Sequence, residues 1–247
     1  MTLERVVADL TEQIERRYYG KYRGIVVDHK DPARLGRLRL RVPSLLGPDV
    51  VTGWATPCLP FGGAADQGFL FVPERNASVW VEFEEGDLEF PIWVGTFWTS
   101  PDAETQLPRP QSDDGSETTE VQDPPIRKII KTAKGHTIQF EDADGKEAVL
   151  VREGVQGHLV RMDGKGVTIT DKRRNTIRLS GDGIEVEENN GNTLRLSRNG
   201  VEMKDSNGSA IRMAGSGMTL TSAVSFTIDA SGQNVTIIAD GINLTKG

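Results

Sequence analysis

The second half of the chain alternates apolar and polar positions with a long, fixed period. The phrase Asn175-Thr-Ile-Arg-Leu-Ser returns 17 residues later as Asn192-Thr-Leu-Arg-Leu-Ser, and after another 17 as Ser209-Ala-Ile-Arg-Met-Ala. Each phrase is an apolar-x-apolar unit flanked by Gly, Asn or Asp, which predicts a short strand with one buried face. A regular train of such strands is typical of a solenoid or a stacked prism.

Nine apolar pairs follow this pattern, and their starting positions step by 7, 10, 7, 10, 7, 8, 9 and 7 residues. The pairs are Ile177/Leu179, Ile184/Val186, Leu194/Leu196, Val201/Met203, Ile211/Met213, Met218/Leu220, Phe226/Ile228, Val235/Ile237 and Ile242/Leu244. Between them we expect turns with positive φ at Asp182-Gly183, Asn190-Gly191, Asn199-Gly200, Asn207-Gly208 and Asp240-Gly241. Residues 135–171 contain degenerate earlier copies of the same unit.

The strand signal of residues 21–98 is different, because aromatic residues and turn dipeptides separate its apolar runs. The candidate strands are Tyr22–Asp28, Gly36–Val42, Trp54–Leu59, Phe69–Val72, Ala77–Phe83 and Phe90–Phe97. Within the fifth, Val79, Val81 and Phe83 alternate with polar or bulky residues, which indicates one buried face. Five or six short strands in about 80 residues predict a small closed barrel, with an OB-fold among the options.

Residues 2–19 have the pattern of an amphipathic helix. Leu3, Val7, Leu10 and Ile14 are spaced 4-3-4, a heptad-like seam that suits packing against another helix. The seam fits either a partner protein or the chain's own first domain, and the sequence leaves both open.

Composition divides the chain between these patterns. All 12 prolines, all four tryptophans and the single Cys58 precede Ile126, and only Phe140 and Phe226 are aromatic after it. Residues 99–125 are rich in Pro, Asp, Ser, Thr and Glu, which is typical of a linker. We therefore predict a helix over 1–19, a barrel over 20–98, a linker over 99–126 and a repetitive β domain over 127–247.

Charge and cysteine content narrow the class of protein. The net charge of −7 argues against a nucleic-acid partner. One cysteine cannot form an internal disulfide, and no apolar run has the length of a signal peptide or a membrane span. These features predict a protein that is assembled in the cytoplasm.

Each repeat strand has two apolar side chains on one face, so a single flat meander would leave this apolar face exposed to solvent. A monomer could bury them by coiling into a left-handed β-helix, or three chains could surround one axis. We favour the intertwined trimer, because a monomeric coil needs three segments per rung whereas the repeat has two apolar pairs. In that trimer strand edges pair with a neighbouring chain. Its exterior would present Arg178, Arg195, Arg212, Glu185, Glu202 and Lys204. The expected trimer core is Ile177, Leu179, Ile184, Val186, Leu194, Leu196, Val201, Met203, Ile211, Met213, Met218, Leu220, Phe226, Ile228, Val235 and Ile237.

An ordered string of motifs in residues 21–98 resembles a known family. It comprises Tyr22-Arg-Gly-Ile-Val-Val-Asp28, Asp31-Pro-Ala-Arg-Leu-Gly-Arg37, Val42-Pro43, Trp54-Ala-Thr-Pro57, Val72-Pro73, Val79-Trp-Val-Glu-Phe83, Gly86-Asp87 and Pro91-Ile-Trp-Val-Gly-Thr-Phe-Trp98. This string resembles the OB-fold domain of baseplate assembly protein V, the spike of contractile phage tails and related injection machines. The spike part of type VI secretion VgrG proteins is a more distant relative.

The resemblance implies an all-β homotrimeric spike. Its OB-fold domains would form a collar beneath a hub protein, and its trimeric β-helix, or β-prism, would be the needle driven through a target envelope. The family serves phage tails, bacteriocins and cell-targeting injection particles, and the resemblance does not choose among them.

The chain departs from some relatives of that family. It has neither a lysozyme-like insertion after the barrel nor a fused hub module, which implies a separate hub protein gripped by Leu3, Val7, Leu10 and Ile14. No histidine follows His158, so the chain cannot build the His-x-His iron apex of some spikes. Ile242, Asn243, Leu244 and Thr245 would then contact a separate PAAR-type tip protein.

The candidates for chemistry have plainer interpretations. Alternation places Glu82 and Glu84 on a solvated strand face, so we interpret the acidic run Glu82–Glu89 as a hairpin and not as a glycosidase pair. Asp142–Glu147 lacks the spacing of a calcium loop and predicts a turn. His136 and His158 each follow glycine and are expected to face outward, although a trimer could form a metal-binding ring from either. Cys58 is expected to be buried, and the basic run Arg34–Arg41 to be one face of a strand.

The sequence therefore predicts a structural spike that has no enzymatic activity, no cofactor and no catalytic or metal-binding residues. A trimeric receptor-binding tail fibre is the alternative, although fibres usually end in a globular head and this chain ends in repeats. An envelope-degrading enzyme is a third hypothesis, for which no candidate active site is found.

Overall fold

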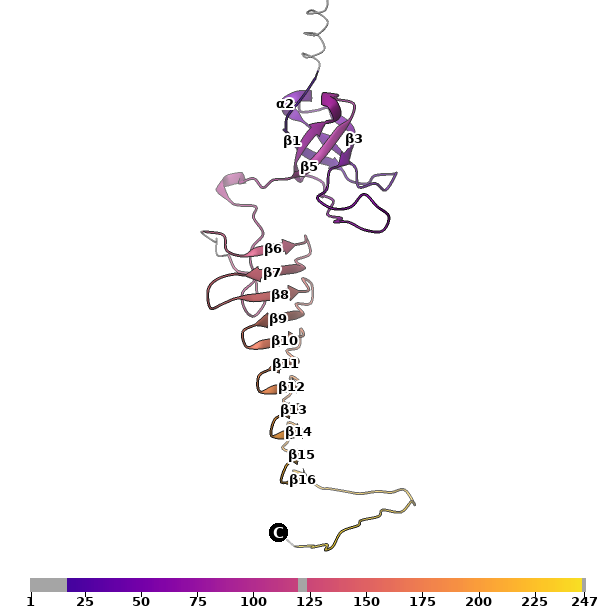
Figure 1. The fold of residues 1–247 in the computed structure, drawn as a ribbon, viewed down its shortest axis with the longest axis vertical. Helices are drawn as coiled ribbons and strands as arrows, with labels where there is room; N and C mark the ends of the chain where they lie inside the picture. The colour runs from indigo at the N-terminus through magenta and orange to yellow at the C-terminus, as the bar shows by residue number, and fades with distance from the viewer. Residues whose placement is uncertain (1–16, 120–123, 246–247) are drawn as a thin grey trace, which may run out of the picture. The chain divides into compact units, whose positions relative to one another are not determined.

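The computed structural model describes residues 17–119 and 124–245, and the chain divides into two compact units, Met1–Leu107 and Pro108–Gly247 (Figure 1). We call them the barrel unit and the sheet unit. The division falls inside the range that the sequence assigns to a linker, so residues 108–119 belong with the sheet unit.

The barrel unit is a closed five-stranded barrel with the strand order β1-β2-β3-β5-β4. Its elements are β1 (Tyr22–Asp28), β2 (Leu38–Arg41), α2 (Pro43–Leu46), β3 (Val51–Pro57), β4 (Ser78–Phe83), η1 (Glu84–Gly86), β5 (Pro91–Thr96) and η2 (Pro101–Ala103). Neighbouring strands are antiparallel except β3 and β5, which are parallel. The prediction of a small OB-like barrel is confirmed.

Alternation along the strands builds the barrel core. Val79, Val81 and Phe83 point inward from β4, and Leu38 and Leu40 do so from β2. Val26, Val42, Ala55 and Trp93 complete the buried cluster. Trp93 also donates its indole N–H to the Gly36 carbonyl at 3.2 Å, which ties β5 to the loop before β2.

The predicted strand Phe69–Val72 is wrong. These residues lie in the long connection between β3 and β4, and Phe69, Leu70 and Phe71 are exposed. The physical reason is closure: β3 pairs with β5 and β4 pairs with β1, so the five-stranded barrel has no open edge for a sixth strand. The aromatic rings instead contact one another, with 6.0 Å between the centroids of Phe61 and Phe69.

A single carboxylate organises the loop between β1 and β2. Asp31 accepts hydrogen bonds from the N–H groups of Ala33 and Leu35, at 3.0 and 2.8 Å, and from the Arg37 guanidinium at 2.7 Å. The Arg37 side chain also lies over the ring of Trp54. The Arg37 hydrogen bond, supported by those from the backbone, holds the pKa of Asp31 well below its ordinary value.

We predict that Asp31→Asn lowers the melting temperature of the protein at pH 7 and that this difference shrinks in acid. A carboxyl group whose pKa is lower in the folded state contributes stability above its unfolded pKa, and this contribution disappears as the pH falls through the folded pKa. The difference should therefore be constant above pH about 4 and narrow below it. Thermal melts followed by circular dichroism from pH 7 to 2.5 test this. A difference in melting temperature between the two proteins that stays the same at every pH would contradict it.

The sheet unit is one eleven-stranded antiparallel sheet in which each strand pairs with its sequence neighbours. Its strands are β6 (Lys128–Lys131), β7 (Thr137–Glu141), β8 (Ala148–Arg152), β9 (Leu159–Asp163), β10 (Gly166–Thr170), β11 (Thr176–Ser180), β12 (Gly183–Glu187), β13 (Thr193–Ser197), β14 (Gly200–Lys204), β15 (Ala210–Ala214) and β16 (Gly217–Thr221). All predicted strands from Ile177 to Leu220 are confirmed. The sequence analysis did not name β6 or β8.

This topology corrects two expectations about how strands pair. A monomeric left-handed β-helix is excluded for β6–β16, because a coil would pair strands in parallel from rung to rung and these pairs are all antiparallel neighbours. The idea that strand edges pair between chains is wrong for β7–β15, since both edges of each are already occupied within the chain. Each chain therefore forms its own continuous antiparallel ladder from β6 to β16.

The last three predicted strands, at Phe226/Ile228, Val235/Ile237 and Ile242/Leu244, are not strands. The ladder ends with β16, and described residues 222–245 form turns and irregular structure. Residue 222 follows β16 as Asp171, Glu188 and Asp205 follow earlier strands, but it is a serine and has no carboxylate to organise the loop. Gly191 and Gly208 have the expected positive φ, whereas Gly241 does not.

The predicted N-terminal helix falls mostly outside the described residues. Of its range, Arg17, Tyr18 and Tyr19 are described and are not helical. Among the described residues, the structure contains no helix with the length and apolar character needed to span a membrane.

Candidate functional site

Two columns of apolar side chains run along one face of the sheet. The strand register places Ile177 opposite Val186 and Leu179 opposite Ile184, and the same correspondence repeats from strand to strand. The first column is Ile130, Ile138, Val151, Val160, Ile169, Ile177, Val186, Leu194, Met203, Ile211 and Leu220. The second is Phe140, Val149, Met162, Val167, Leu179, Ile184, Leu196, Val201, Met213 and Met218.

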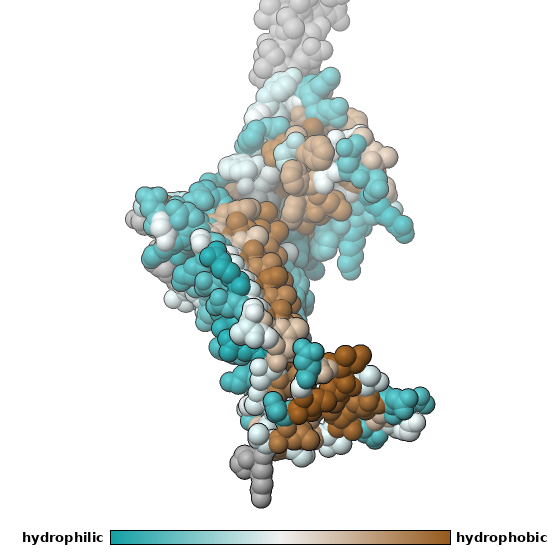
Figure 2. Space-filling view, turned by 60° about the horizontal axis from the view of Figure 1, so that its bottom comes forward, coloured by the Kyte–Doolittle hydropathy of each residue, from teal (hydrophilic) through white to brown (hydrophobic). Residues whose placement is uncertain are grey.

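This apolar face is open to solvent in the single chain. Ile184 and Leu196 in mid-sheet are 42% and 39% exposed, and Met218 on the last strand is 61% exposed. Figure 2 shows the face as a hydrophobic stripe along the sheet unit, flanked by hydrophilic surface. Ten spacings of about 4.8 Å make the columns roughly 48 Å long. A contiguous apolar surface of this extent marks an interaction site.

The predicted core residues divide between this face and the tail. Twelve of the sixteen, from Ile177 to Leu220, belong to the two columns, so the structure brings them together on one surface. Phe226, Ile228, Val235 and Ile237 lie in the irregular segment after β16 and are exposed. The sequence analysis omitted the upper part of the columns, from Ile130 to Ile169, where the repeat is degenerate.

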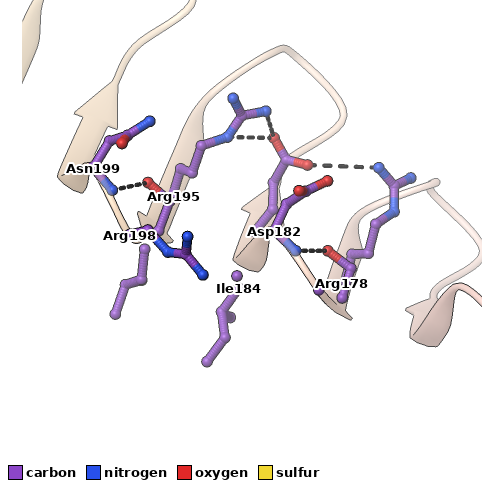
Figure 3. Close-up of a pocket in the computed structure, with 12 residues that line it drawn as sticks. Arg178, Asp182, Ile184, Arg195, Arg198 and Asn199 are labelled. Carbon is purple, nitrogen blue, oxygen red and sulfur yellow. Dashed lines mark hydrogen bonds and ion pairs between the residues drawn. The ribbon is translucent and has the colours of Figure 1, made fainter.

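The opposite face presents a row of alternating charges, as the sequence predicted. Arg178, Glu185, Arg195, Glu202 and Arg212 face one another across successive strands. Glu185 accepts hydrogen bonds from Arg195 and lies 3.5 Å from the Arg178 guanidinium (Figure 3). Ile184, on the neighbouring position, points away from this network. Glu185 is therefore paired with two arginines of its own chain.

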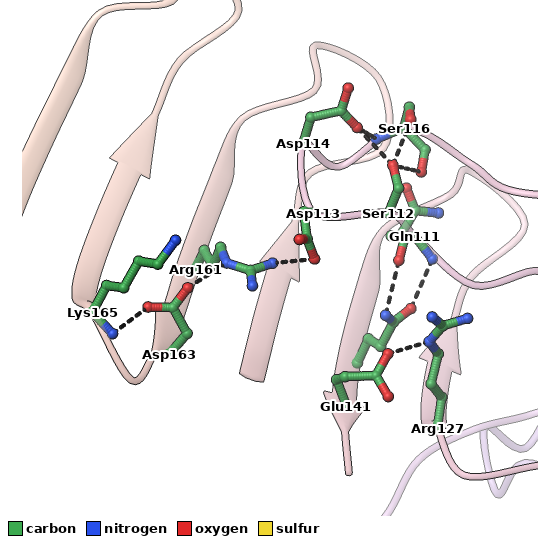
Figure 4. A network of polar contacts seen from close by, with 11 residues as sticks. Gln111, Ser112, Asp113, Asp114, Ser116, Arg127, Glu141, Arg161, Asp163 and Lys165 are labelled. Atoms are coloured by element: carbon green, nitrogen blue, oxygen red, sulfur yellow. Dashed lines mark hydrogen bonds and ion pairs between the residues drawn. The ribbon is translucent and has the colours of Figure 1, made fainter. Parts of the chain in front are cut away.

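The upper part of the polar face is covered by residues 108–119. Gln111 and Gln139 exchange two hydrogen bonds: the Gln111 backbone N–H donates to the Gln139 side-chain oxygen at 2.7 Å, and the Gln139 amide donates to the Gln111 carbonyl at 2.9 Å (Figure 4). Gln139 is 1% exposed and Leu150 on β8 is 2% exposed. The cover therefore buries a second small core beneath it, formed by Ala148, Leu150 and Leu159.

Ion pairs fasten this cover to the sheet. Arg161 on β9 bonds Asp113 at 2.7 Å and Asp163 at 2.8 Å, and Lys131 on β6 pairs with Glu117. Because of the Arg161 hydrogen bond, the pKa of Asp163 lies below its ordinary value. This contact was not predicted from the sequence. The unbroken apolar run Ala148–Val151 was the available signal, since it indicates a strand that is covered on both faces.

Glycine begins every second strand of the repeat for a steric reason. A Cβ on Gly183 would lie 2.0 Å from the Leu196 carbonyl oxygen, and on Gly166 or Gly200 1.9 Å from the equivalent oxygen. The φ angles of these three glycines are also strongly positive, between 125° and 132°. A side chain would therefore force the adjacent strand away, which explains why the 17-residue repeat contains this glycine.

The longer loops of the repeat are organised by carboxylates. Asp171 accepts hydrogen bonds from the N–H groups of Arg173 and Asn175, both at 2.8 Å, and Asp205 accepts them from Asn207 and Ser209. Burial raises the pKa of Asp171, but the hydrogen bonds from Asn175 and Arg173 outweigh it, and the pKa lies below its ordinary value. Successive loops are linked, since Asn175 accepts from the Asn189 N–H and Asn192 from the Ser206 N–H.

The other residues singled out in the sequence are dispersed. Glu82 pairs with Lys21, and Asp87 lies 4.0 Å from Arg17, on the outside of the barrel unit. Asp142–Glu147 is a turn, as predicted, with Gly145 at a φ of 75°. Among the described residues no group of three or more His, Cys, Asp and Glu side chains is placed to hold a metal ion.

His136, His158 and Cys58 lie outside the apolar columns. His136 accepts a hydrogen bond from the Gly154 N–H at 3.1 Å, in a loop outside the apolar columns, and His158 ends the next loop on that edge. Cys58 is exposed, which corrects the expectation of burial, because alternation from buried Ala55 places Thr56 and Cys58 on the outer side of the barrel.

Two family models match the chain over the two units just described. Residues 22–98 match the type VI secretion system/phage-baseplate injector OB domain, and residues 128–195 match the phage baseplate V C-terminal trimerisation domain. The chain belongs to the baseplate V family of spike proteins. The comparison with curated proteins found no match.

The matched trimerisation domain spans β6 to most of β13, so it contains the upper half of both columns. A trimerisation domain supports self-association as a homotrimer. The chain has the structural role of a baseplate spike and is part of a phage or injection particle.

Proposed function

We propose that three copies of this chain form a rigid spike at the tip of a contractile injection apparatus, joined to a hub protein above and to a tip protein below. The observation that supports this most strongly is the pair of apolar columns, which run along eleven and ten successive strands and which the described residues leave partly exposed to solvent. Three such faces turned toward a common axis form a prism whose core is apolar and whose exterior is the charged row.

The energetics favour this arrangement. Each column residue has lost only part of its exposed surface, and covering the remainder contributes roughly 1 kcal/mol per side chain. Three walls bury both columns of every chain at once. A face-to-face sandwich of two sheets would also bury them, and the match to a trimerisation domain favours three copies. The backbone of each wall is tied into a continuous hydrogen-bonded ladder, which resists bending along the axis. The spike therefore acts passively, as a stiff body, and not as an enzyme.

The partners follow from the two ends of the chain. The hub contact would involve Leu3, Val7, Leu10 and Ile14, which lie outside the described residues. The tip contact would involve Ile242, Asn243, Leu244 and Thr245, of which Leu244 is 94% exposed. An exposed apolar end suits a PAAR-type cap that covers it.

We predict that the purified chain is a trimer. Size-exclusion chromatography with light scattering should give a mass of about 81 kDa, three times the 27.0 kDa of one chain. Particles assembled without this protein should retain sheath and tube but fail to puncture target envelopes. A monomer with a well-folded sheet unit would contradict the prism, and full puncturing activity without the protein would contradict the spike.

A further inference from the structure

The two edges of the sheet differ in their connections. The short-turn edge holds the turns after β7, β9, β11, β13 and β15, and the long-loop edge holds the loops after β6, β8, β10, β12 and β14. The short-turn edge comprises residues 142–147, 164–165, 181–182, 198–199 and 215–216. The long-loop edge comprises residues 132–136, 153–158, 171–175, 188–192 and 205–209.

A closed ring of identical walls brings unlike edges together. This step rests on the proposed trimer: under threefold symmetry the short-turn edge of each copy must lie beside the long-loop edge of the next. Rotation about the threefold axis leaves the position of every residue along that axis unchanged. Each short turn of one copy therefore lies level with the interval between two long loops of the neighbouring copy. A tilt of the strands then decides whether it meets the loop that precedes it in sequence or the one that follows.

Several charges on these edges have no ion-pair partner in the single chain. Among the described residues, Asp182 and Arg198 on the short-turn edge form no ion pair, and neither do Arg173 and Arg174 on the long-loop edge. In Figure 3 the side chains of Asp182 and Arg198 have no dashed contact, whereas Arg178 and Arg195 do. On the polar face, by contrast, Glu185 forms ion pairs with Arg178 and Arg195 of its own chain.

The charges alternate in sign over the first four loops of the long-loop edge and the first four turns of the short-turn edge. The fifth loop contains Asp205, and the fifth turn, 215–216, is uncharged. On the long-loop edge, loop 132–136 is basic because of Lys134, and loop 153–158 is acidic because of Glu153. Loop 171–175 has one aspartate, one lysine and two arginines, for a net charge of +2, and loop 188–192 is acidic because of Glu188. On the short-turn edge, turn 142–147 has three acidic residues against one lysine for a net charge of −2, and the next three turns contain Lys165, Asp182 and Arg198.

Only one of the two pairings is complementary throughout. If each short turn meets the neighbour's preceding loop, opposite charges meet at each of the four levels that have a charged turn. Turn 142–147 then meets Lys134, Lys165 meets Glu153, Asp182 meets the basic loop 171–175, and Arg198 meets Glu188. If it meets the following loop, like charges meet at three levels, and only Arg198, opposite Asp205, is attracted. Like charges in contact disfavour a pairing and so select its alternative.

We infer that the turn charges form an interface between copies of this chain, in which each short turn docks on the preceding long loop of the adjacent copy. The apolar columns drive association but are uniform along the axis, so they do not discriminate between the preceding-loop and the following-loop pairing. The charges on the edges do discriminate, because like charges disfavour the following-loop pairing. They fix the register of the three walls, which is the choice of the preceding loop.

Pairs of introduced cysteines test this register in the full-length chain. In a Cys58→Ser background, Asp182→Cys with Arg173→Cys should form disulfides under mild oxidation and give a covalent trimer on denaturing gels. The two positions lie at opposite ends of β11, about 17 Å apart in one chain, so an intramolecular bond is impossible. The matched control is Asp182→Cys with Asn190→Cys, which occupies the equivalent place in the following loop and should remain monomeric on the gel.

A third pair shows that the control position can react. Arg198→Cys with Asn190→Cys should give a covalent trimer, because loop 188–192 precedes that turn. A covalent trimer from the control pair, or none from the other two pairs in a protein that light scattering shows to be trimeric, would overturn the inferred register. Loss of the trimer itself in the Cys58→Ser background would instead count against the proposed function.

Discussion

Leu196→Asp is expected to convert the trimer into monomers. Leu196 lies in the second apolar column, where three copies would place three carboxylates around one axis. An unpaired charge in such an interior costs about 3–5 kcal/mol. Three of them cost about 10 kcal/mol, which lowers the association constant by about seven orders of magnitude. Light scattering at micromolar concentration measures the result directly, and the equivalent change Ile184→Asp should have the same effect.

An aspartate on the other face is the control for this experiment. Thr168 lies on β10 between Arg161 and Arg178 on the polar face. Thr168→Asp introduces the same charge beside two guanidinium groups and should leave the trimer intact. If the Leu196→Asp protein remained trimeric, the apolar columns would not be the trimer core. If the Thr168→Asp protein were monomeric, loss of the trimer would result from added charge anywhere on the sheet and not from charge on the apolar face.

Gly183→Ala is expected to destabilise the sheet unit by about 2–4 kcal/mol per chain. The added Cβ would lie 2.0 Å from the Leu196 carbonyl oxygen, so β12 and β13 must separate, and alanine also disfavours a φ of 130°. Because the loss occurs in every copy, the midpoint of thermal unfolding should fall markedly when it is measured at fixed protein concentration.

Two further glycines separate the steric effect from the backbone effect. Gly217 has a φ of 132° but no atom within 4 Å of its Cβ position, and Gly181 has neither feature. Gly217→Ala should therefore cost about 1–2 kcal/mol from backbone strain alone, and Gly181→Ala should be close to neutral. A loss for Gly183→Ala no larger than for Gly217→Ala would show that contact with β13 does not require the glycine.

The sequence predicted the strands wherever local signals were strong. The repeat from Asn175 to Leu220 places each apolar pair, each turn and each glycine at a fixed offset, and every one of those strands is present. It failed where the period broke: after Thr221 the apolar pairs continue, but Ser222 replaces the loop carboxylate and no ladder forms. Apolar spacing alone is insufficient, because a strand also needs a paired neighbour.

The misassigned segments have the same kind of explanation. Phe69–Val72 has the composition of a strand, and its exclusion follows from closure of the barrel through β3 and β5, a contact between residues far apart in sequence. Residues 108–119 have the composition of a linker, yet Gln111 reaches Gln139 and Asp113 reaches Arg161. Neither contact has a local signature in the segment that makes it.

The sequence by itself determined the all-β class, the division between barrel and repeat, the apolar and charged faces and the likeness to baseplate V spikes, because these depend on periodicity and on short ordered motifs. The tertiary structure decided that each chain completes its own ladder, that the apolar columns extend up to β6 and that unpaired charges gather on the two sheet edges. Those features depend on strand register and on long-range pairing, which arise only when distant segments meet.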